Sequence, residues 1–136
     1  MGAMMFLPNF VDHLVFRVSD IDRTTCFYSA LLGEPYKEDS YVMYRAGDTL
    51  MFFTPSMAPP EPYDKEKVGL NHIALGVRTL DELRMVESQL NRASIAHSGI
   101  KVWRDGVTRY IWLDDPDGIR VEYWLRSPEE ALPQAK

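Results

Sequence analysis

The sequence lacks several features that mark whole classes of protein. Its single cysteine, Cys26, excludes an internal disulfide and indicates a reduced, cytoplasmic setting. No apolar run approaches the roughly 20 residues that a membrane-spanning helix needs, and no basic segment precedes the apolar N-terminal residues, so a signal peptide is not expected. Fifteen Lys and Arg against twenty Asp and Glu give a net charge of −5 without a basic run. Neither a membrane nor a nucleic acid is therefore expected as a partner.

What the sequence does contain is an internal repeat. The 136 residues are 46% hydrophobic, which is typical of one globular domain. Residues 11–18 (VDHLVFRV) are similar to residues 70–77 (LNHIALGV), so that His72 repeats His13. Each stretch is followed by a helix start, at residues 19–22 and at residues 79–82, and in the second Glu82 completes a capping box with Thr79. The chain therefore consists of two modules of roughly 60 residues.

Short strand-like runs follow each predicted helix. They span residues 41–45 and 49–53 in the first half and residues 99–103, 109–113 and 119–125 in the second, with a Pro-Asp-Gly turn before the last. The predicted order is β-α-β-β-β, twice. Residues 10–54 form the first module, 55–67 a proline-rich linker, 68–126 the second module and 127–136 a polar C-terminal tail, all within one compact domain.

Strand alternation predicts which side chains face the same way. The aliphatic and aromatic residues of each first strand should pack on the helix, which leaves His13 and His72 on the opposite face. On the last strand, Glu122 points to the face of the histidines. Two imidazoles and a carboxylate form a set of ligands for Fe, Mn, Zn, Ni or Co and leave coordination positions open. The sequence therefore predicts a metal site of His13, His72 and Glu122.

Further residues are predicted to surround this site. Aromatic and basic side chains on the last two strands, with one methionine of the first module, are candidates to line a substrate pocket: Met51, Tyr110, Trp112, Arg120 and Trp124. Tyr110 and Asp48 are candidate acid–base groups, although a packed tyrosine and a solvated aspartate are the more ordinary interpretations.

These motifs resemble the vicinal oxygen chelate superfamily, which includes glyoxalase, bleomycin resistance and dioxygenase proteins. The resemblance covers about residues 10 to 126 and rests on residues 11–14 (VDHL), 27–33 (FYSALLG), 70–74 (LNHIA) and 115–122 (DPDGIRVE). It implies an α+β fold in which two tandem βαβββ modules form a curled mixed-sheet cup around a divalent metal, with the helices outside. It also implies a homodimer, in which the modules either close on each other or are exchanged between chains.

The resemblance carries the family's ligand positions onto His13, Met51, His72 and Glu122. Met51 is found by aligning residues 47–51 with residues 118–122. It departs from the glyoxalase I pattern, because methionine is more typical of apolar lining than of a hard-metal ligand.

Three ligands with open positions favour, narrowly, an enzyme that applies dioxygenase-type chemistry to a small molecule with vicinal oxygens. The alternatives are a metal-dependent lyase or isomerase, a fosfomycin-type transferase, and a non-catalytic protein that binds or sequesters a small molecule.

Overall fold

The computed structural model describes residues 2–59 and 61–126. The first module consists of β1 (His13–Val18), α1 (Ile21–Leu32), β2 (Tyr36–Glu38), β3 (Tyr41–Ala46) and β4 (Thr49–Pro55). The second consists of β5 (His72–Val77), α2 (Leu80–Arg92), β6 (Lys101–Val102), β7 (Arg109–Asp114) and β8 (Arg120–Leu125). Each module forms a mixed four-stranded sheet, in the orders β1-β4-β3-β2 and β5-β8-β7-β6. The predicted fold of two tandem βαβββ modules is confirmed.

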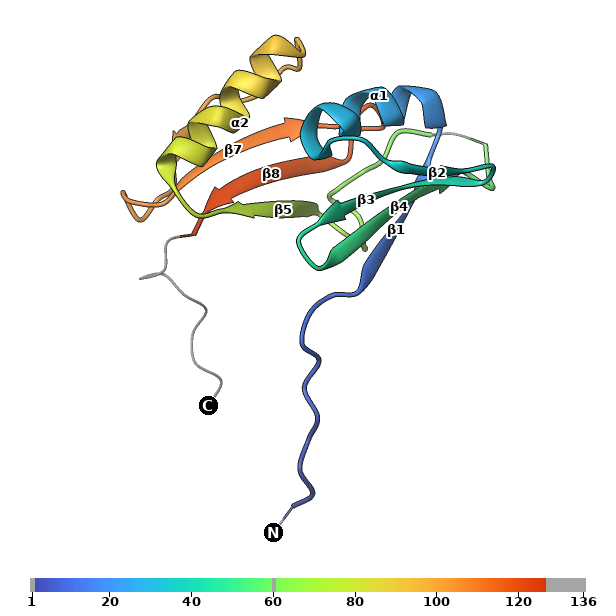
Figure 1. Ribbon diagram of the computed structural model, residues 1–136, viewed down its shortest axis with the longest axis horizontal. Coiled ribbons are helices and arrows are strands. Elements are labelled where there is room, and N and C mark those ends of the chain that lie inside the picture. Colours follow the sequence, from blue (N-terminus) through green and yellow to red (C-terminus); the bar gives the residue numbers. More distant parts are fainter. Residues whose placement is uncertain (1, 60, 127–136) are drawn as a thin grey trace.

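The two helices lie on the same side of the molecule, above the two sheets (Figure 1). The sheet faces below them are not covered by a helix of the described chain. Burial along the strands alternates accordingly: on β1, Phe16 and Val18 are buried, whereas His13, Val15 and Arg17 are exposed. The predicted division of β1 into a helix-facing and an open face is therefore correct.

Both helices begin at capping residues, of which the sequence indicated Thr79. The carboxylate of Asp20 accepts hydrogen bonds from the backbone N–H groups of Asp22 and Arg23, and the Thr79 hydroxyl accepts one from Glu82. The first helix ends at Gly33, whose φ of 83° suits a residue without a side chain. These local signals fix where each helix starts relative to the strand before it.

One strand of the first module was not located from the sequence. β2 is three residues long, and all three are exposed, so it has no apolar alternation to reveal it. It pairs with β3 at the edge of the sheet. The predicted C-terminal tail, residues 127–136, lies outside the described residues.

The two modules are joined by a buried hydrogen bond. The hydroxyl of Tyr28, on α1, donates to the carboxylate of Asp115, in the turn between β7 and β8, at 2.8 Å. Asp115 also accepts from the backbone N–H groups of Asp117 and Ile119. Burial raises the pKa of Asp115, and burial together with the neighbouring carboxylate raises the pKa of Tyr28. The first helix is thus fastened to the turn that precedes β8.

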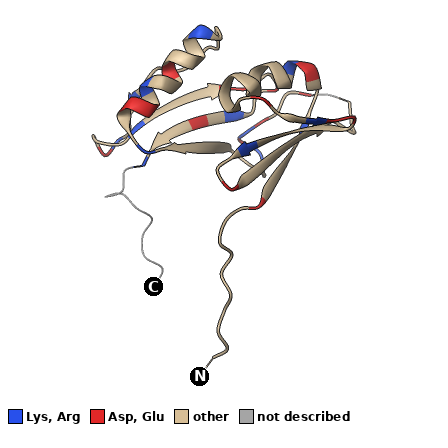
Figure 2. Ribbon diagram, in the orientation of Figure 1, with Lys and Arg blue, Asp and Glu red and all other residues tan. Residues whose placement is uncertain are grey.

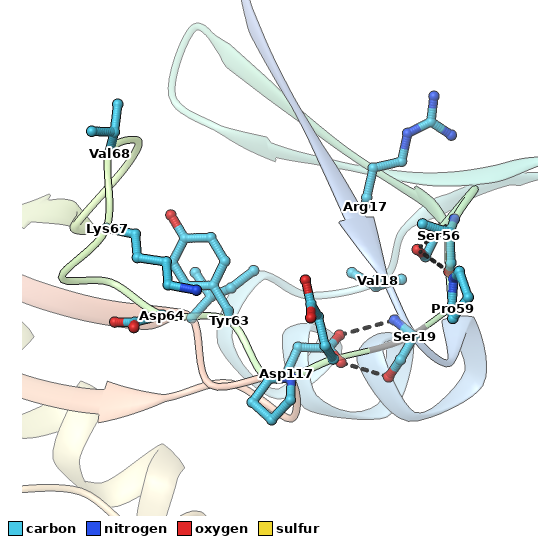
Figure 3. Close-up of a pocket in the computed structure, with 14 residues that line it drawn as sticks. Arg17, Val18, Ser19, Ser56, Pro59, Tyr63, Asp64, Lys67, Val68 and Asp117 are labelled. Carbon is cyan, nitrogen blue, oxygen red and sulfur yellow. Dashed lines mark hydrogen bonds between the residues drawn. The ribbon is translucent and has the colours of Figure 1, made fainter.

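A second, more exposed contact fastens the end of β1 to the same turn. The carboxylate of Asp117 accepts from the backbone N–H and the hydroxyl of Ser19 (Figure 3). The backbone carbonyl of Asp117 accepts from the N–H of Tyr63, in the segment that connects the modules. Among residues 2–59 and 61–126, no helix is long and apolar enough to cross a membrane.

Candidate metal-binding site

The centre of the candidate site lies on the open face of the second sheet. His72, the first residue of β5, directs Nε2 toward Oε1 of Glu122 on β8, at 3.6 Å. Glu122 is 9% exposed, and it accepts a hydrogen bond of 2.6 Å from the indole Nε1–H of Trp124. The structure therefore brings together two of the three predicted ligands.

The protonation of His72 follows from its other nitrogen. Nδ1 lies 2.8 Å from the side-chain oxygen of Asn71, whose amide nitrogen donates to the carbonyl of Lys65 and so fixes the amide orientation. Nδ1 therefore carries a proton, and in the neutral imidazole Nε2 then bears a lone pair. That lone pair and the carboxylate of Glu122 face each other at a distance too long for a hydrogen bond. Two facing electron-pair donors of this kind fit a cation placed between them.

The first module presents a similar histidine. Nδ1 of His13 lies 2.8 Å from a carboxylate oxygen of Asp12, which accepts the Nδ1–H, so Nε2 of the neutral ring bears the lone pair that can bind a metal. Such an oxygen partner at Nδ1 is the usual means of orienting a metal-binding histidine. Sequence reasoning missed Asp12 and Asn71, although the signal was present: an oxygen-bearing side chain precedes the histidine in both copies of the repeat.

The three predicted ligands do not meet within one chain. Among the residues that the structure describes, no group of three or more His, Cys, Asp or Glu side chains lies close enough to hold a metal ion. His13 is on the edge strand β1 of the first sheet, whereas His72 and Glu122 are on the second. His13 instead contacts the ring of Phe52, at 5.6 Å between centroids.

Strand register corrects the fourth family position. In the second module, Ala74 pairs with Glu122 two residues after His72; in the first, Val15 pairs with Phe52 two residues after His13. The equivalent of Glu122 is therefore Phe52, and the expectation of Met51 was wrong by one residue. The turn before β4 contains two residues and that before β8 five, so aligning the glycines shifts the register.

Met51 also differs from the other predicted pocket residues in its direction. It is fully buried on the helix-facing side of β4, with Leu14 as its register partner. It therefore does not share a face with His13. It lines an apolar cavity of about 530 Å³ between the modules, together with Ile73, Leu75 and Tyr123.

The remaining predicted pocket residues lie around Glu122. Tyr110 stacks on Trp124 with 4.9 Å between ring centroids, and Trp103 meets the edge of both rings. The guanidinium of Arg120 lies 4.1 Å from the ring centre of Trp112. All three tryptophans of the chain are thus gathered around the second sheet.

Arg120 is less available to a substrate than the sequence suggested. Its Nε donates to Asp114 at 2.6 Å while the guanidinium covers Trp112, so its charge is already paired. Asp48 is exposed in the two-residue turn between β3 and β4. Its carboxylate shares no strand face with Glu122.

A separate polar cavity of about 330 Å³ lies where the connecting segment crosses the end of β1. Arg17, Asp64, Lys67 and Asp117 line it, as Figure 3 shows. None of the predicted ligands lines this cavity. Figure 2 shows that charged residues gather mainly on the helices and connecting segments, whereas the segment before β1 has none up to Asp12.

Several solved structures share this fold. Among solved structures, a glyoxalase family protein from Enterococcus faecalis shares 23% identity with a TM-score of 0.69, and the match covers 85% of this chain and 97% of that one. A lactoylglutathione lyase from Agrobacterium tumefaciens shares 19% identity with a TM-score of 0.66, covering 88% and 95%. An oxidase, ChaP-H1, shares 18% identity with a TM-score of 0.65, covering 88% and 97%.

At these identities the neighbours show the fold alone, and no curated protein matches. The family assignment comes from the sequence itself. Residues 10–123 match the family described as the Glyoxalase/Bleomycin resistance protein/Dioxygenase superfamily, which is nearly the whole of both modules. The superfamily includes metal-dependent lyases and oxygenases, and its members commonly use a divalent metal. The chain therefore belongs to the Glyoxalase/Bleomycin resistance protein/Dioxygenase superfamily.

Proposed function

We propose that this protein is a cytoplasmic, metal-dependent enzyme that acts on a small molecule with vicinal oxygens. The observation that carries the proposal is the pair of His72 Nε2 and Glu122 Oε1, which face each other 3.6 Å apart on the open face of the second sheet. Each donor is oriented from behind, His72 by Asn71 and Glu122 by Trp124. A divalent cation between them would be bound by both groups.

We propose that a second copy of the chain completes the site with its own His13. Two observations support this step. The face of β1 that carries His13 is open, with Val15 57% exposed beside it, and the preceding segment exposes Phe6 and Phe10 without any charged neighbour. β1 and β5 are also edge strands, and each leaves one row of backbone groups without a partner in its sheet. A homodimer with exchanged modules would cover both features.

The chemistry follows from the number of ligands. A bound metal supplies Lewis-acid stabilisation to two substrate oxygens and to the negative charge that develops on them. Phe52 at the fourth position adds no ligand, so three protein donors leave positions open, and we favour dioxygenase-type chemistry on that ground. The residues of the chain hold and orient: Trp124 fixes the carboxylate of Glu122, while Asp12 and Asn71 hold the proton on Nδ1 of each histidine. Lyase or transferase chemistry at the same three ligands is the second candidate.

The test combines metal analysis with subunit complementation. Wild type is expected to take up one divalent metal per chain, and His13→Ala or Glu122→Gln to weaken its binding at least tenfold. His97→Ala is the matched control, since His97 lies in the loop after α2 and its Nε2 is hydrogen-bonded to the side chain of Asn91. Mixing His13→Ala with His72→Ala chains should restore some high-affinity sites, because one mixed dimer site would contain no substitution.

Two results would contradict the proposal. Metal content equal in wild type and the His13→Ala variant removes His13 from the site. Failure of the mixed sample to exceed either variant alone, although subunits exchange, removes the second copy. Oxygen uptake with a catechol, lost in Glu122→Gln, favours the oxygenase over the other reactions.

A further inference from the structure

The apolar cavity of about 530 Å³ between the modules, here called the inter-module cavity, is separate from the candidate metal site. Aliphatic and methionine side chains from both modules line it: Leu14, Leu32, Met51, Ile73 and Leu75. His13, His72 and Glu122 are not among its lining residues. A molecule bound in this cavity would therefore contact both modules without contacting the predicted metal ligands.

The lining of the inter-module cavity carries no charged side chain. Among the lining residues of the described chain, Thr49 and Tyr123 alone have a polar side chain. An apolar wall with a few placed polar groups is typical of sites for small molecules. A charged group would lose its hydration there without gaining an ionic partner. The cavity therefore favours a neutral, largely apolar ligand.

Tyr123 differs from the other buried tyrosines of the described chain in its hydrogen bonding. The hydroxyl of Tyr28 donates to Asp115, and that of Tyr44 donates to the carbonyl of Thr25. Tyr123 is 6% exposed, and its hydroxyl has no hydrogen-bond partner among the residues that the structure describes. Leaving a buried hydroxyl unpaired costs about 1–3 kcal/mol, which phenylalanine would avoid at the same position. Folding alone therefore does not account for this hydroxyl.

The unpaired hydroxyl belongs to a residue that lines the inter-module cavity. Within the described chain, Thr24 Oγ1 is the one fully enclosed side-chain atom without a partner, so Oη of Tyr123 is not sealed in the core. Burial raises the pKa of Tyr123, so the hydroxyl keeps its proton at neutral pH and can donate. A neutral acceptor oxygen on an otherwise apolar molecule would satisfy it.

We propose that the inter-module cavity is a second ligand site, which binds an uncharged, largely aliphatic molecule whose carbonyl oxygen accepts a hydrogen bond from Tyr123. The aliphatic body lies against the apolar lining of both modules. The site requires no metal ion and shares no residue with the predicted ligand set, so it does not rest on the proposed function. Because the ligand contacts both modules only when they are folded together, it should also raise the thermal stability of the chain.

The experiment uses the full chain in excess EDTA and two nine-carbon probes, nonan-2-one and the nonanoate anion. Binding is followed by NMR on 13C-methyl-labelled methionines, with the Met51 signal identified by its loss in Met51→Leu. Nonan-2-one is expected to shift the Met51 signal, to raise the melting temperature and to bind at least tenfold more tightly than nonanoate. The signal of Met85, which is 62% exposed on α2, should not shift.

Tyr123→Phe should weaken nonan-2-one binding at least threefold, because the apolar lining stays while the donor is lost. Tyr44→Phe is the matched control: it also removes a buried hydroxyl, but one that is paired within the chain and does not line the cavity, so it should bind as wild type does. A thermal melt verifies that each variant folds. Absence of ketone binding, equal affinities for the two probes, or unchanged ketone binding by Tyr123→Phe would overturn the inference.

Discussion

The position equivalent to Glu122 can be tested by moving a carboxylate along β4 by one residue. Strand register places Phe52 there, on the open face beside His13, while Met51 points into the core. Glutamate at position 51 should therefore destabilise the protein strongly, whereas glutamate at position 52 should be tolerated. The comparison separates the register seen in the structure from the alignment of turn glycines that favours Met51.

Met51→Glu should come close to unfolding the protein. Met51 is 0% exposed, so the substitution forfeits about 1.5–3 kcal/mol of apolar burial. It also places a carboxylate between Leu14 and Tyr44, its register partners, where no cation is available, and this costs several kcal/mol more. The sum of about 5 kcal/mol is comparable with the entire stability of a small domain.

Phe52→Glu should fold. Phe52 is half-buried and loses ring contacts with His13 and Tyr41, at 5.6 and 5.4 Å, which amounts to about 1–2 kcal/mol. If the proposed site assembles, the new carboxylate joins three donors and should raise metal affinity at least tenfold, while Phe52→Gln, of similar shape without charge, should raise it less. Urea unfolding at neutral pH and metal titration measure both effects. A stable Met51→Glu protein with tighter metal binding, beside an unfolded Phe52→Glu protein, would refute the register argument.

Three further predictions concern the groups that hold the modules and ligands in place. Tyr28→Phe should lower the unfolding free energy by about 1.5–3 kcal/mol in urea, because it removes a hydrogen bond to a buried carboxylate without leaving a cavity. Tyr123→Phe, whose hydroxyl has no hydrogen bond in the described chain, should change it by less than about 0.5 kcal/mol; equal effects would contradict the assignment. Burial raises the pKa of Asp115, so the folded chain retains its proton to higher pH than the unfolded chain. Its stabilising contribution is complete below the unfolded pKa of about 3.9 and is lost as pH rises through the folded pKa. The unfolding free energy of wild type minus that of Asp115→Asn should thus grow as pH falls from neutral toward the unfolded pKa, and a flat difference would contradict the raised pKa. Asn71→Ala should weaken metal binding about 10–100-fold with little change in thermal stability, because His72 then loses the partner that fixes its tautomer; unchanged affinity would separate Asn71 from the site.

The fold could be predicted because its signals are local and occur twice. His13 and His72 stand at matching points of two similar strands, and Asp20 and Thr79 cap the helices that follow. Alternation on β1 and β5 then assigns each histidine to the open face. These inferences need no knowledge of how distant segments meet, and the structure agrees with them. β2 escaped prediction because three exposed residues carry no pattern.

The errors at the site arise where distant segments meet. Sequence alignment matches Gly47 with Gly118, but the turns between paired strands differ in length, and one residue of slip reverses the face of a strand side chain. The availability of Arg120 was misjudged for a related reason, since its partner Asp114 lies across the β7–β8 turn. A linear sequence shows the residue type at each position but does not show its cross-strand neighbour.

The separation of His13 from His72 and Glu122 is informative about how such a site would be controlled. In a single chain, His13 is oriented by an oxygen of Asp12 and His72 by an oxygen of Asn71. The carboxylate of Glu122, however, lies beside His72 and not beside His13. The orientation of each histidine side chain is therefore determined by the residue before it. Completion of the ligand set depends instead on which open sheet faces come together. The same open face that would complete the metal site also carries exposed Val15 and the edge of β1, so under the proposed dimer, association and metal binding stabilise each other by linkage. Substitutions on this face should consequently be interpreted from measurements of both properties, because a loss of metal binding could originate in either.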